Sequence, residues 1–457
     1  MSTSAEGTLA PSVHDVTLKS AISKAARHLM PMLVILYFVA FLDRTNVGFA
    51  EAALKVDRGV SDGAFALGAG IFFIGYALFE VPSNLLLKRF GARFWLARIA
   101  ITWGIVAAAF AFTTNDTMFT ALRFLLGVTE AGLFPGVIMY LSEWFPNKVR
   151  VQMFAIFYLA QPFSQMIGAP LSGGLISFGD SLTPWHGWQV MFFVEGALAV
   201  VAGIASMFLL TNSPAKARFL DEDQKLALSQ AMAHEDRART EDGPNGIWRA
   251  MGNWKVWYFT VIYFALQIAV YGTTFYLPQQ VAGLLGKKVG WEVGLVSAVP
   301  WFVGLFACYF LGKAAHTVAR RRNWGSLLYI GTGVFILGSG WAGANNQPLL
   351  GILFITLAVA SFLSVGPITW AYPTSFLTGA AAAAGIGLIN SLGNLGGFVA
   401  PLMRTSINSA VPTGSGVWGV VSLGVFAFLA ALMVYLTKFF RTAKSDELLD
   451  EAVAPQH

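Results

Sequence analysis

The chain has 457 residues, of which 56% are hydrophobic and only 12% are charged. An average soluble domain has about 25% charged residues, so this chain lacks the polar surface that a soluble protein of its size needs. The composition therefore excludes a soluble globular enzyme and predicts a membrane protein. The net charge of +6 is then expected on cytoplasmic loops rather than at a nucleic-acid site.

Apolar runs of spanning length recur along the chain, each bounded by charged residues or by Gly and Pro. A helix that crosses the hydrocarbon core of a bilayer needs about 20 apolar residues. The sequence therefore predicts an all-α membrane protein with twelve transmembrane helices, at 29–50, 65–87, 94–113, 118–141, 151–178, 188–210, 256–282, 291–312, 325–343, 349–372, 380–403 and 417–440.

These runs fall into two groups of six. The long polar stretch at 211–254 separates them and is rich in charged residues. We therefore expect one bundle over 29–210, a central loop over 211–254 and a second bundle over 255–440. Polar tails at 1–28 and 441–457 complete the chain. Two halves of this kind are typical of transporters.

Lys and Arg are distributed unevenly between the two sides of the predicted bundle. If both termini are cytoplasmic, the segments on that side carry 22 of the 30 Lys and Arg, and the opposite side carries 5, Arg404 among them. The other three are Arg44, Arg98 and Arg123, inside the runs. Because cytoplasmic loops retain positive charge during insertion, this asymmetry predicts cytoplasmic N and C termini.

A charged side chain in the hydrocarbon core costs roughly 2.5–3.5 kcal/mol, so the charges inside the runs need an explanation. All lie in the first half, whereas the second half has amides, hydroxyls and aromatic residues at depth. For Glu80, near Lys88 and Arg89, a structural ion pair is favoured. Whether Glu80, Arg98 and Glu195 are functional or only structural stays open. The remaining charges are Asp43, Arg44, Arg123 and Glu130.

Helical geometry orients two adjacent residues of the first run. The side chains of Asp43 and Arg44 point about 100° apart, so they serve different surfaces. Arg44 shares its face with Tyr37 and Phe41. We expect Arg44 to face a central cavity without a protein partner, and Asp43 to turn towards the fourth run.

In the fourth run, Arg123, Gly127 and Glu130 repeat at i, i+4 and i+7 and so lie along one stripe. A base and an acid on one stripe suit proton transfer. An ion pair that only locks the first and fourth runs together is the alternative, above all for Arg123.

Uncharged polar residues in apolar runs supply further candidates for a binding cavity. A single residue of this kind more often stabilises the packing of two helices than contacts a ligand. Several of them, however, are spaced one helical turn apart and so share one face. Those that we expect to line the cavity are Tyr37, Tyr76, Gln161, Gln267, Tyr271, Trp370, Asn390 and Asn394.

Several motifs together resemble those of the anion:cation symporter family of the major facilitator superfamily. They are FLDRTNVG at 41–48, EVPSN at 80–84, RFLLGVTEAG at 123–132, SEWFP at 142–146 and GIGLINSLGNLGG at 385–397. The resemblance covers about 29–440. It implies the major facilitator fold and proton-coupled uptake of organic anions by alternating access, in a bacterial inner membrane.

Residue roles follow from the same resemblance. In galactonate-type members, the aspartate of the Asp-Arg pair and the glutamate of span four carry protons, and the arginine binds the substrate carboxylate. These roles correspond to Asp43, Glu130 and Arg44. The resemblance also implies cavity contacts at Tyr76, Gln161, Trp370 and Asn390.

The predicted function is therefore proton-coupled import of a small organic carboxylate. Burial favours the neutral form of a carboxylic acid and a neighbouring arginine favours the charged form, so an arginine that exchanges partners links substrate to proton. Uptake of one anion into an inside-negative cell costs about 2.3 kcal/mol per 100 mV, which the two protons of Asp43 and Glu130 would offset.

Two other classes of function are alternatives to this prediction. An uncoupled facilitator or drug exporter of the same fold would show no dependence on a pH gradient. An integral-membrane enzyme would need clustered histidines or a nucleophile with its base, but the six histidines are dispersed. The substrate stays open, since the tyrosines suit an aromatic acid and the amides suit a sugar acid or a hydroxy-dicarboxylate. No cofactor, metal or nucleic acid is expected, and the protein is expected to work as a monomer in the lipid bilayer.

Overall fold

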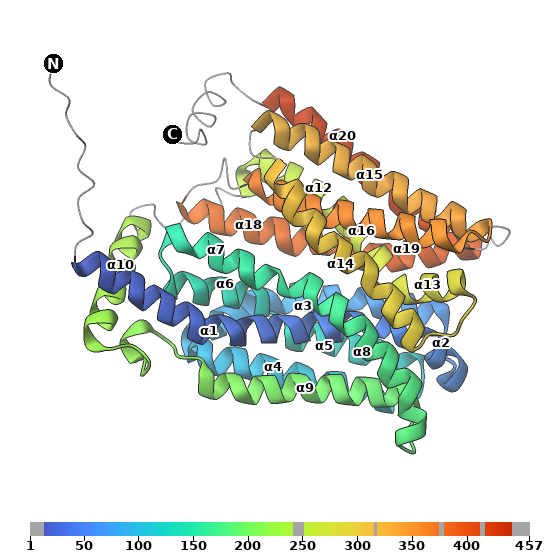
Figure 1. Cartoon of the computed structure of the whole chain (residues 1–457), viewed down its shortest axis with the longest axis horizontal. Helices are drawn as coiled ribbons and strands as arrows, with labels where there is room; N and C mark the ends of the chain where they lie inside the picture. Colours follow the sequence, from blue (N-terminus) through green and yellow to red (C-terminus); the bar gives the residue numbers. More distant parts are fainter. Residues whose placement is uncertain (1–12, 241–250, 315–317, 374–378, 412–415, 441–457) are drawn as a thin grey trace.

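The computed structural model describes residues 13–240, 251–314, 318–373, 379–411 and 416–440, and all regular structure in these ranges is helical. The predicted C-terminal tail at 441–457 lies outside them, as do residues 1–12 of the N-terminal tail and 241–250 of the central loop. Figure 1 shows the helices roughly aligned along the long axis, with the N-terminal half below and the C-terminal half above.

The helices of the N-terminal half coincide with the six predicted runs. Each forms where apolar residues continue for about 20 positions, because lipid leaves a backbone no hydrogen-bond partners except its own. In chain order they are α1 (Val13–Thr45) with α2 (Val47–Arg58), α3 (Asp62–Phe90), α4 (Ala92–Ala109), α5 (Asp116–Glu130) with α6 (Leu133–Trp144), α7 (Asn147–Tyr158) with α8 (Ala160–Leu182), and α9 (Gly187–Leu209).

The C-terminal half repeats this arrangement. Its helices are α12 (Trp254–Thr274) with α13 (Leu277–Leu285), α14 (Trp291–Ala314), α15 (Val318–Ala344), α16 (Pro348–Ala371), α18 (Gly379–Asn394) with α19 (Gly396–Ala410), and α20 (Val417–Leu436).

Eleven helices in the described ranges are long and apolar enough to cross a membrane. The predicted run at 151–178 corresponds to α7 and α8 and is not among them, since polar side chains such as Gln161, Ser164 and Gln165 dilute its apolar residues. α8 nevertheless packs against α1, α9 and α14 along the bundle. The all-α polytopic fold is confirmed, and the number of twelve spans stays a prediction.

Several of the predicted runs are interrupted within their length. α1 ends at Thr45 and α2 begins at Val47, α5 ends at Glu130 and α6 begins at Leu133, and α18 ends at Asn394. At the second break Gly132 adopts φ +90°, and a Cβ there would lie 2.4 Å from the Ser83 hydroxyl oxygen. Only glycine fits both this backbone conformation and this contact.

The two halves close on each other at one end of the bundle. There α2 lies against α13, α3 against α19 and α8 against α14, at the right of Figure 1. A Cβ on Gly48 would lie 2.1 Å from the carbonyl oxygen of Phe275, and one on Gly173 would lie 2.5 Å from that of Gly290. Glycine alone permits such an approach of two backbones. The count of positive charges predicts that this end faces the outside of the cell.

Arg404 corrects one detail of that count. We expected it in an outside loop after 403, but α19 continues to Ala410 and includes it. Its guanidinium stacks over the Tyr276 ring at 4.1 Å and donates a hydrogen bond to the carbonyl oxygen of Gly272 at 3.2 Å. These contacts satisfy a cation that sequence alone leaves free to lie in solvent.

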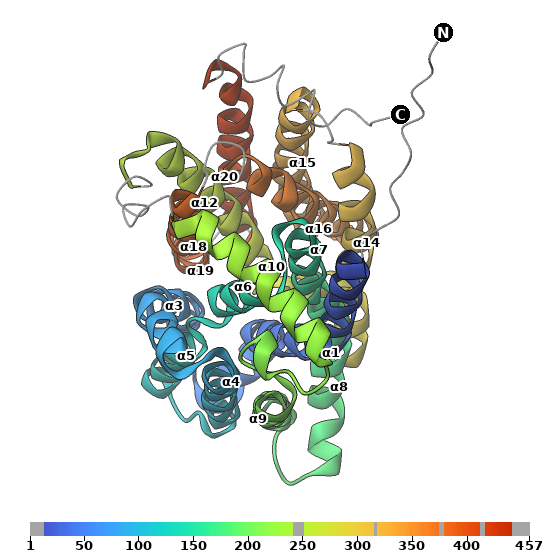
Figure 2. The same ribbon diagram turned by 90° about the vertical axis from the view of Figure 1, so that its left-hand side faces the viewer.

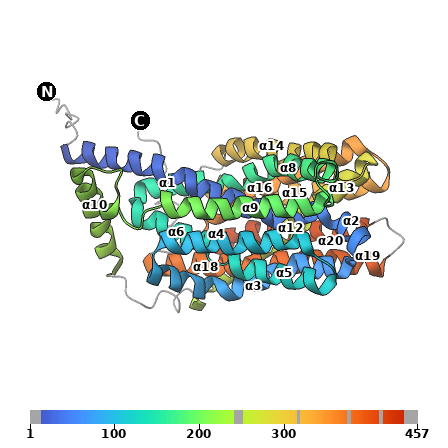
Figure 3. The same ribbon diagram turned by 90° about the horizontal axis from the view of Figure 1, so that it is seen from below.

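The opposite end carries helical structure where a tail and a loop were expected. α1 begins at Val13, well before residue 29, and α10 (Glu222–Thr240) forms inside the central loop. α1 and α10 pack together beyond the ends of the other helices (Figure 3). Lys24 donates to Gln224 at 2.9 Å, and Gln224 donates to Ser20 at 3.0 Å. Periodicity of apolar residues could not predict α10, because its sequence is predominantly polar.

Candidate functional site

The guanidinium of Arg44 lies between the two halves and bonds to both. Arg44 is 8% exposed at the end of α1. Its Nη2 donates to Glu130 Oε1 on α5, and its Nη1 donates to the Tyr271 hydroxyl on α12 at 3.3 Å. The expectation of an unpartnered Arg44 is therefore wrong. An unpaired guanidinium in hydrocarbon is expensive, and an acid from a neighbouring helix offsets that cost.

Aromatic rings surround the same guanidinium. Its Cζ lies 4.7 Å from the ring centre of Phe41, 5.0 Å from that of Phe72 and 5.5 Å from that of Tyr76. The predicted shared face is confirmed, since Tyr37 packs edge-on against Phe41 at 4.9 Å. A cation among rings retains favourable interactions while it changes its anionic partner.

Asp43 points away from that space. Its Oδ2 accepts a hydrogen bond from Trp103 Nε1 at 2.9 Å, so the side chain turns towards α4, in the third run. The prediction that it faces the fourth run is wrong, because sequence gives the angle between adjacent side chains and not the rotation of the helix. Asp43 is 2% exposed, and its Oδ1 has no hydrogen-bond partner in the described residues.

Glu195 lies close enough to Asp43 for the two to repel when both are charged. It is fully buried on α9 and accepts from Asn46 Nδ2 at 2.8 Å and from the Ser172 hydroxyl at 2.7 Å. Neither acid has a cation within ion-pair distance in the described part of the chain. Two such charges are costly in hydrocarbon, which favours a proton on at least one of them.

Arg123 and Glu130 lie on one buried stripe of α5, as predicted. This stripe faces α3, because a Cβ on Gly127 between them would lie 2.0 Å from the carbonyl oxygen of Phe72. Arg123 is 1% exposed and donates from Nε to the carbonyl oxygen of Gly68 at 3.1 Å. Its Nη2 has no hydrogen-bond partner among the described residues. Arg123 therefore has a free donor near Glu130, with which it interacts electrostatically.

A chain of amides lines the facing helices of the C-terminal half. Gln267 Nε2 on α12 donates to Asn394 Oδ1 on α18 at 2.6 Å, and Asn394 Nδ2 donates to Asn390 Oδ1 at 3.1 Å. Gln267 lies one turn before Tyr271, and the Tyr271 hydroxyl accepts a hydrogen bond from Arg44. The row of hydrogen-bonded amides therefore begins next to the Arg44 site. Five of the predicted cavity residues are thus brought together: Arg44, Tyr271, Gln267, Asn394 and Asn390.

Glu80 also bridges the halves, which corrects the expected ion pair with Lys88 or Arg89. Its Oε2 accepts from the Ser391 hydroxyl on α18 at 2.8 Å, and it is 4% exposed. Sequence could not show this contact, because the partner comes from the other half, more than 300 residues away.

The structure places two further predicted cavity residues, Trp370 and Gln161, on α16 and α8. Trp370 on α16 packs against the Tyr263 ring at 4.8 Å. Gln161 is half-buried near the start of α8. Arg98 lies apart on α4, stacked over Trp95 at 4.0 Å.

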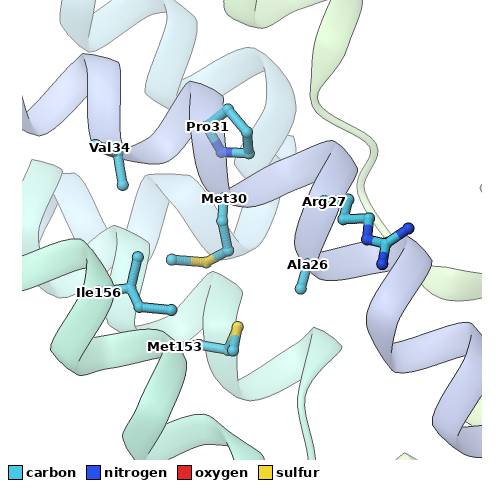
Figure 4. A pocket seen from close by; sticks show the side chains of 7 residues that line it. All are labelled: Ala26, Arg27, Met30, Pro31, Val34, Met153 and Ile156. Carbon is cyan, nitrogen blue, oxygen red and sulfur yellow. The ribbon is translucent and has the colours of Figure 1, made fainter.

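A cavity of about 340 Å³ lies elsewhere, at the flank of the N-terminal half (Figure 4). It lies between α1 and α7, and its lining includes Met30, Val34, Met153 and Ile156, with Arg27 at its edge. It does not coincide with the polar group around Arg44.

Comparison with known proteins identifies the family. The Major Facilitator Superfamily profile matches residues 33–401. The chain belongs to the Major Facilitator Superfamily. It is therefore a multi-pass membrane transporter and not an enzyme, and its polar group between the halves lies where a transporter of two six-helix halves has its binding site.

Relatives extend over nearly the whole transporter. A protein named "Putative tartrate transporter" from Agrobacterium vitis is 39% identical over 91% of this chain and 95% of its own length. The "Quinolone resistance transporter" of Acinetobacter baumannii is 35% identical over 92% of this chain and 95% of its own length. A crystal structure of a bacterial homologue of the human lysosomal transporter Spinster, inward-facing and unoccupied, has a TM-score of 0.72 at 16% identity, covering 94% of this chain and 98% of its own.

Proposed function

We propose that this transporter imports a small organic carboxylate together with protons across the bacterial inner membrane. The observation that carries the proposal is the buried Arg44–Glu130 ion pair, which is hydrogen-bonded to Tyr271 of the other half. A substrate carboxylate fits the guanidinium of Arg44 in the same way as the Glu130 carboxylate does. The curated relative named as a tartrate transporter supports an organic acid as cargo.

Exchange of partners at Arg44 would couple the substrate to a proton. When Glu130 takes up a proton it no longer attracts the guanidinium strongly, and Arg44 becomes free to bind the incoming anion. When the substrate leaves, Arg44 draws the charged form of Glu130 back and the proton departs. Arg123, with its free donor on the same stripe, would hold Glu130 near Arg44 throughout.

Asp43 would carry a second proton. It is buried and lies next to Arg44 in sequence, and within the described ranges its side chain has the neutral Trp103 donor as its one hydrogen-bond partner. Two protons with a monoanion move one positive charge inward, so the inside-negative potential would drive uptake by about 2.3 kcal/mol per 100 mV.

Transport in proteoliposomes tests the proposal. With a panel of sugar acids, hydroxy-dicarboxylates and aromatic acids, Glu130→Gln and Asp43→Asn should each abolish accumulation driven by a pH gradient but retain counterflow exchange. Arg44→Ala should lose both activities. Arg98→Ala removes a guanidinium outside the site and is the matched control, expected to retain both. Carboxylate uptake that survives Arg44→Ala would refute the anion site.

Export of a drug-like compound is the second candidate, and the quinolone resistance relative favours it. Efflux of a cationic or zwitterionic drug would not need a guanidinium in the cavity. If wild-type protein lowers drug accumulation in cells and Arg44→Ala leaves that effect unchanged, export rather than carboxylate import is the function.

A further inference from the structure

Glu80 is a buried acid whose side chain, among the described residues, accepts a hydrogen bond from a hydroxyl group alone. Its Oε2 accepts from Ser391 across the two halves at 2.8 Å. It makes no ion pair in the part of the chain that the structure describes, and no donor is found for its Oε1 there. An acid in this setting needs hydroxyl or amide donors from whatever faces it.

Its position relates it directly to Arg44. Tyr76 precedes Glu80 by one turn of α3, and the Tyr76 ring stacks on the Arg44 guanidinium at 5.5 Å. One turn is about 6 Å along the helix axis. A substrate that is bound at Arg44 by its carboxylate and extends along α3 would reach Glu80 with a chain of about three to five carbons.

The opposite wall is provided by α18, which lies beside α3 in the end-on view of Figure 2. Ser391 follows Asn390, the end of the amide chain that starts at Gln267. An organic acid bound between α3 and α18 would therefore meet the amides of α12 and α18 on one side and the Glu80 carboxyl on the other. Any rearrangement that separates α3 from α18 takes the Ser391 hydroxyl from Glu80.

We infer that Glu80 determines specificity by accepting a hydrogen bond from a hydroxyl group of the substrate, in place of Ser391. This inference rests on the proposed carboxylate site at Arg44 and narrows its substrate class. The class is aliphatic acids with hydroxyl groups a few carbons from the carboxylate bound at Arg44. Acids without hydroxyl groups leave Glu80 with no donor and are rejected, since a site built to bond a hydroxyl discriminates strongly against the analogue that lacks it.

Substrate pairs that differ only in hydroxyl groups test this inference. Binding of tartrate against succinate, and of gluconate against hexanoate, is measured by titration calorimetry on the purified protein. Wild type should prefer the hydroxylated member of each pair by roughly tenfold or more, the range for a hydrogen bond to a charged group. Glu80→Ala should remove most of that preference, and Glu80→Gln, which still accepts a hydrogen bond, should lose only part of it.

Ser391→Ala is the matched control, because it removes the contact between the halves and leaves the Glu80 carboxyl in place. It should keep the preference of wild type. An unchanged preference in Glu80→Ala, or an equal loss in Ser391→Ala, would overturn the inference and identify Glu80 as a structural tie. Failure of the carboxylate site itself looks different, since wild type would then bind neither member of a pair and Arg44→Ala would change nothing.

Discussion

Two neighbouring glycines on α8 provide a matched test of how the halves close. A Cβ on Gly173 would lie 2.5 Å from the Gly290 carbonyl oxygen across the interface, whereas the nearest atom to a Cβ on Gly174 is Trp291 Cε3 at 3.4 Å. The first contact is far too short and the second is ordinary. Both substitutions to alanine raise helix propensity equally, so a difference between them reports the contact between α8 and α14.

Gly173→Ala should therefore disfavour the closed arrangement, and Gly174→Ala should leave it unchanged. Overpacking of this kind costs about 1–3 kcal/mol. Because each 1.4 kcal/mol is tenfold in an equilibrium, the closed state loses about 5- to 150-fold against states in which α8 and α14 are separate. The substitution should change the equilibrium between closed and open arrangements and not the stability of either half. The reason is that the clash lies at the interface between the halves, outside the core of each.

Chemical labelling of a buried reporter measures this shift. Ser297 is fully buried on α14, one turn after Gly294, whose own Cβ would lie 2.5 Å from the Ala169 carbonyl oxygen on α8. In a background without Cys308, Ser297→Cys should react with an impermeant maleimide from outside the cell much faster when Gly173→Ala is added. Equal rates in the Gly173→Ala, Gly174→Ala and parent proteins would refute the reasoning, and faster labelling from the cytoplasm would show that the predicted orientation is inverted.

Two further substitutions probe the site and the core. Tyr271→Phe removes the hydroxyl that bonds Arg44 at 3.3 Å and keeps the ring packed on Phe73 at 4.5 Å. Because one hydrogen bond contributes about 0.5–1.5 kcal/mol, the substitution should weaken carboxylate binding by about 2- to 12-fold. An unchanged affinity in titration calorimetry would exclude a role for the hydroxyl. Gly127→Ala brings a Cβ within 2.0 Å of the Phe72 carbonyl oxygen inside the N-terminal half, so it should lower the melting temperature or prevent folding. Gly63→Ala, in open space on α3, is its control, and equal melting temperatures would contradict the packing argument.

Apolar length was sufficient to predict nearly every helix, because lipid requires a continuous hydrogen-bonded backbone wherever the chain crosses it. The exceptions are informative. α10 has no apolar run of spanning length and forms on the extended α1 through polar contacts such as that of Lys24 with Gln224. Arg404 was assigned to a loop because charge usually ends a span, yet Tyr276 and a carbonyl oxygen satisfy it within α19.

The candidate site was predicted as a set of residues and not as a set of bonds. The free-energy cost of a charged side chain in hydrocarbon indicates Asp43, Arg44 and Glu130 as functional candidates. The spacing of one helical turn indicates that Gln267 and Tyr271 lie on one face. The hydrogen-bond partners depend on two features of the tertiary structure. The rotation of α1 about its axis turns Asp43 towards Trp103. The contact between the two halves brings Ser391, from a helix distant in sequence, to Glu80. Periodicity within one helix holds no information on either.

The interruptions at Asn46, Gly132 and Leu395 lie within a few residues of Arg44, Glu130 and Asn394. Each of these three polar residues consequently lies next to a break between two short helices and not in the middle of one continuous helix. If the outer segments α2 and α19 tilt when the closing end opens, the inner segments α1 and α18 can keep Arg44 and Asn394 in place, whereas Glu130, at the end of the outer segment α5, would move relative to Arg44. A change of access between the two sides of the membrane would then need no bending within an intact helix and no movement of Arg44 through the hydrocarbon core.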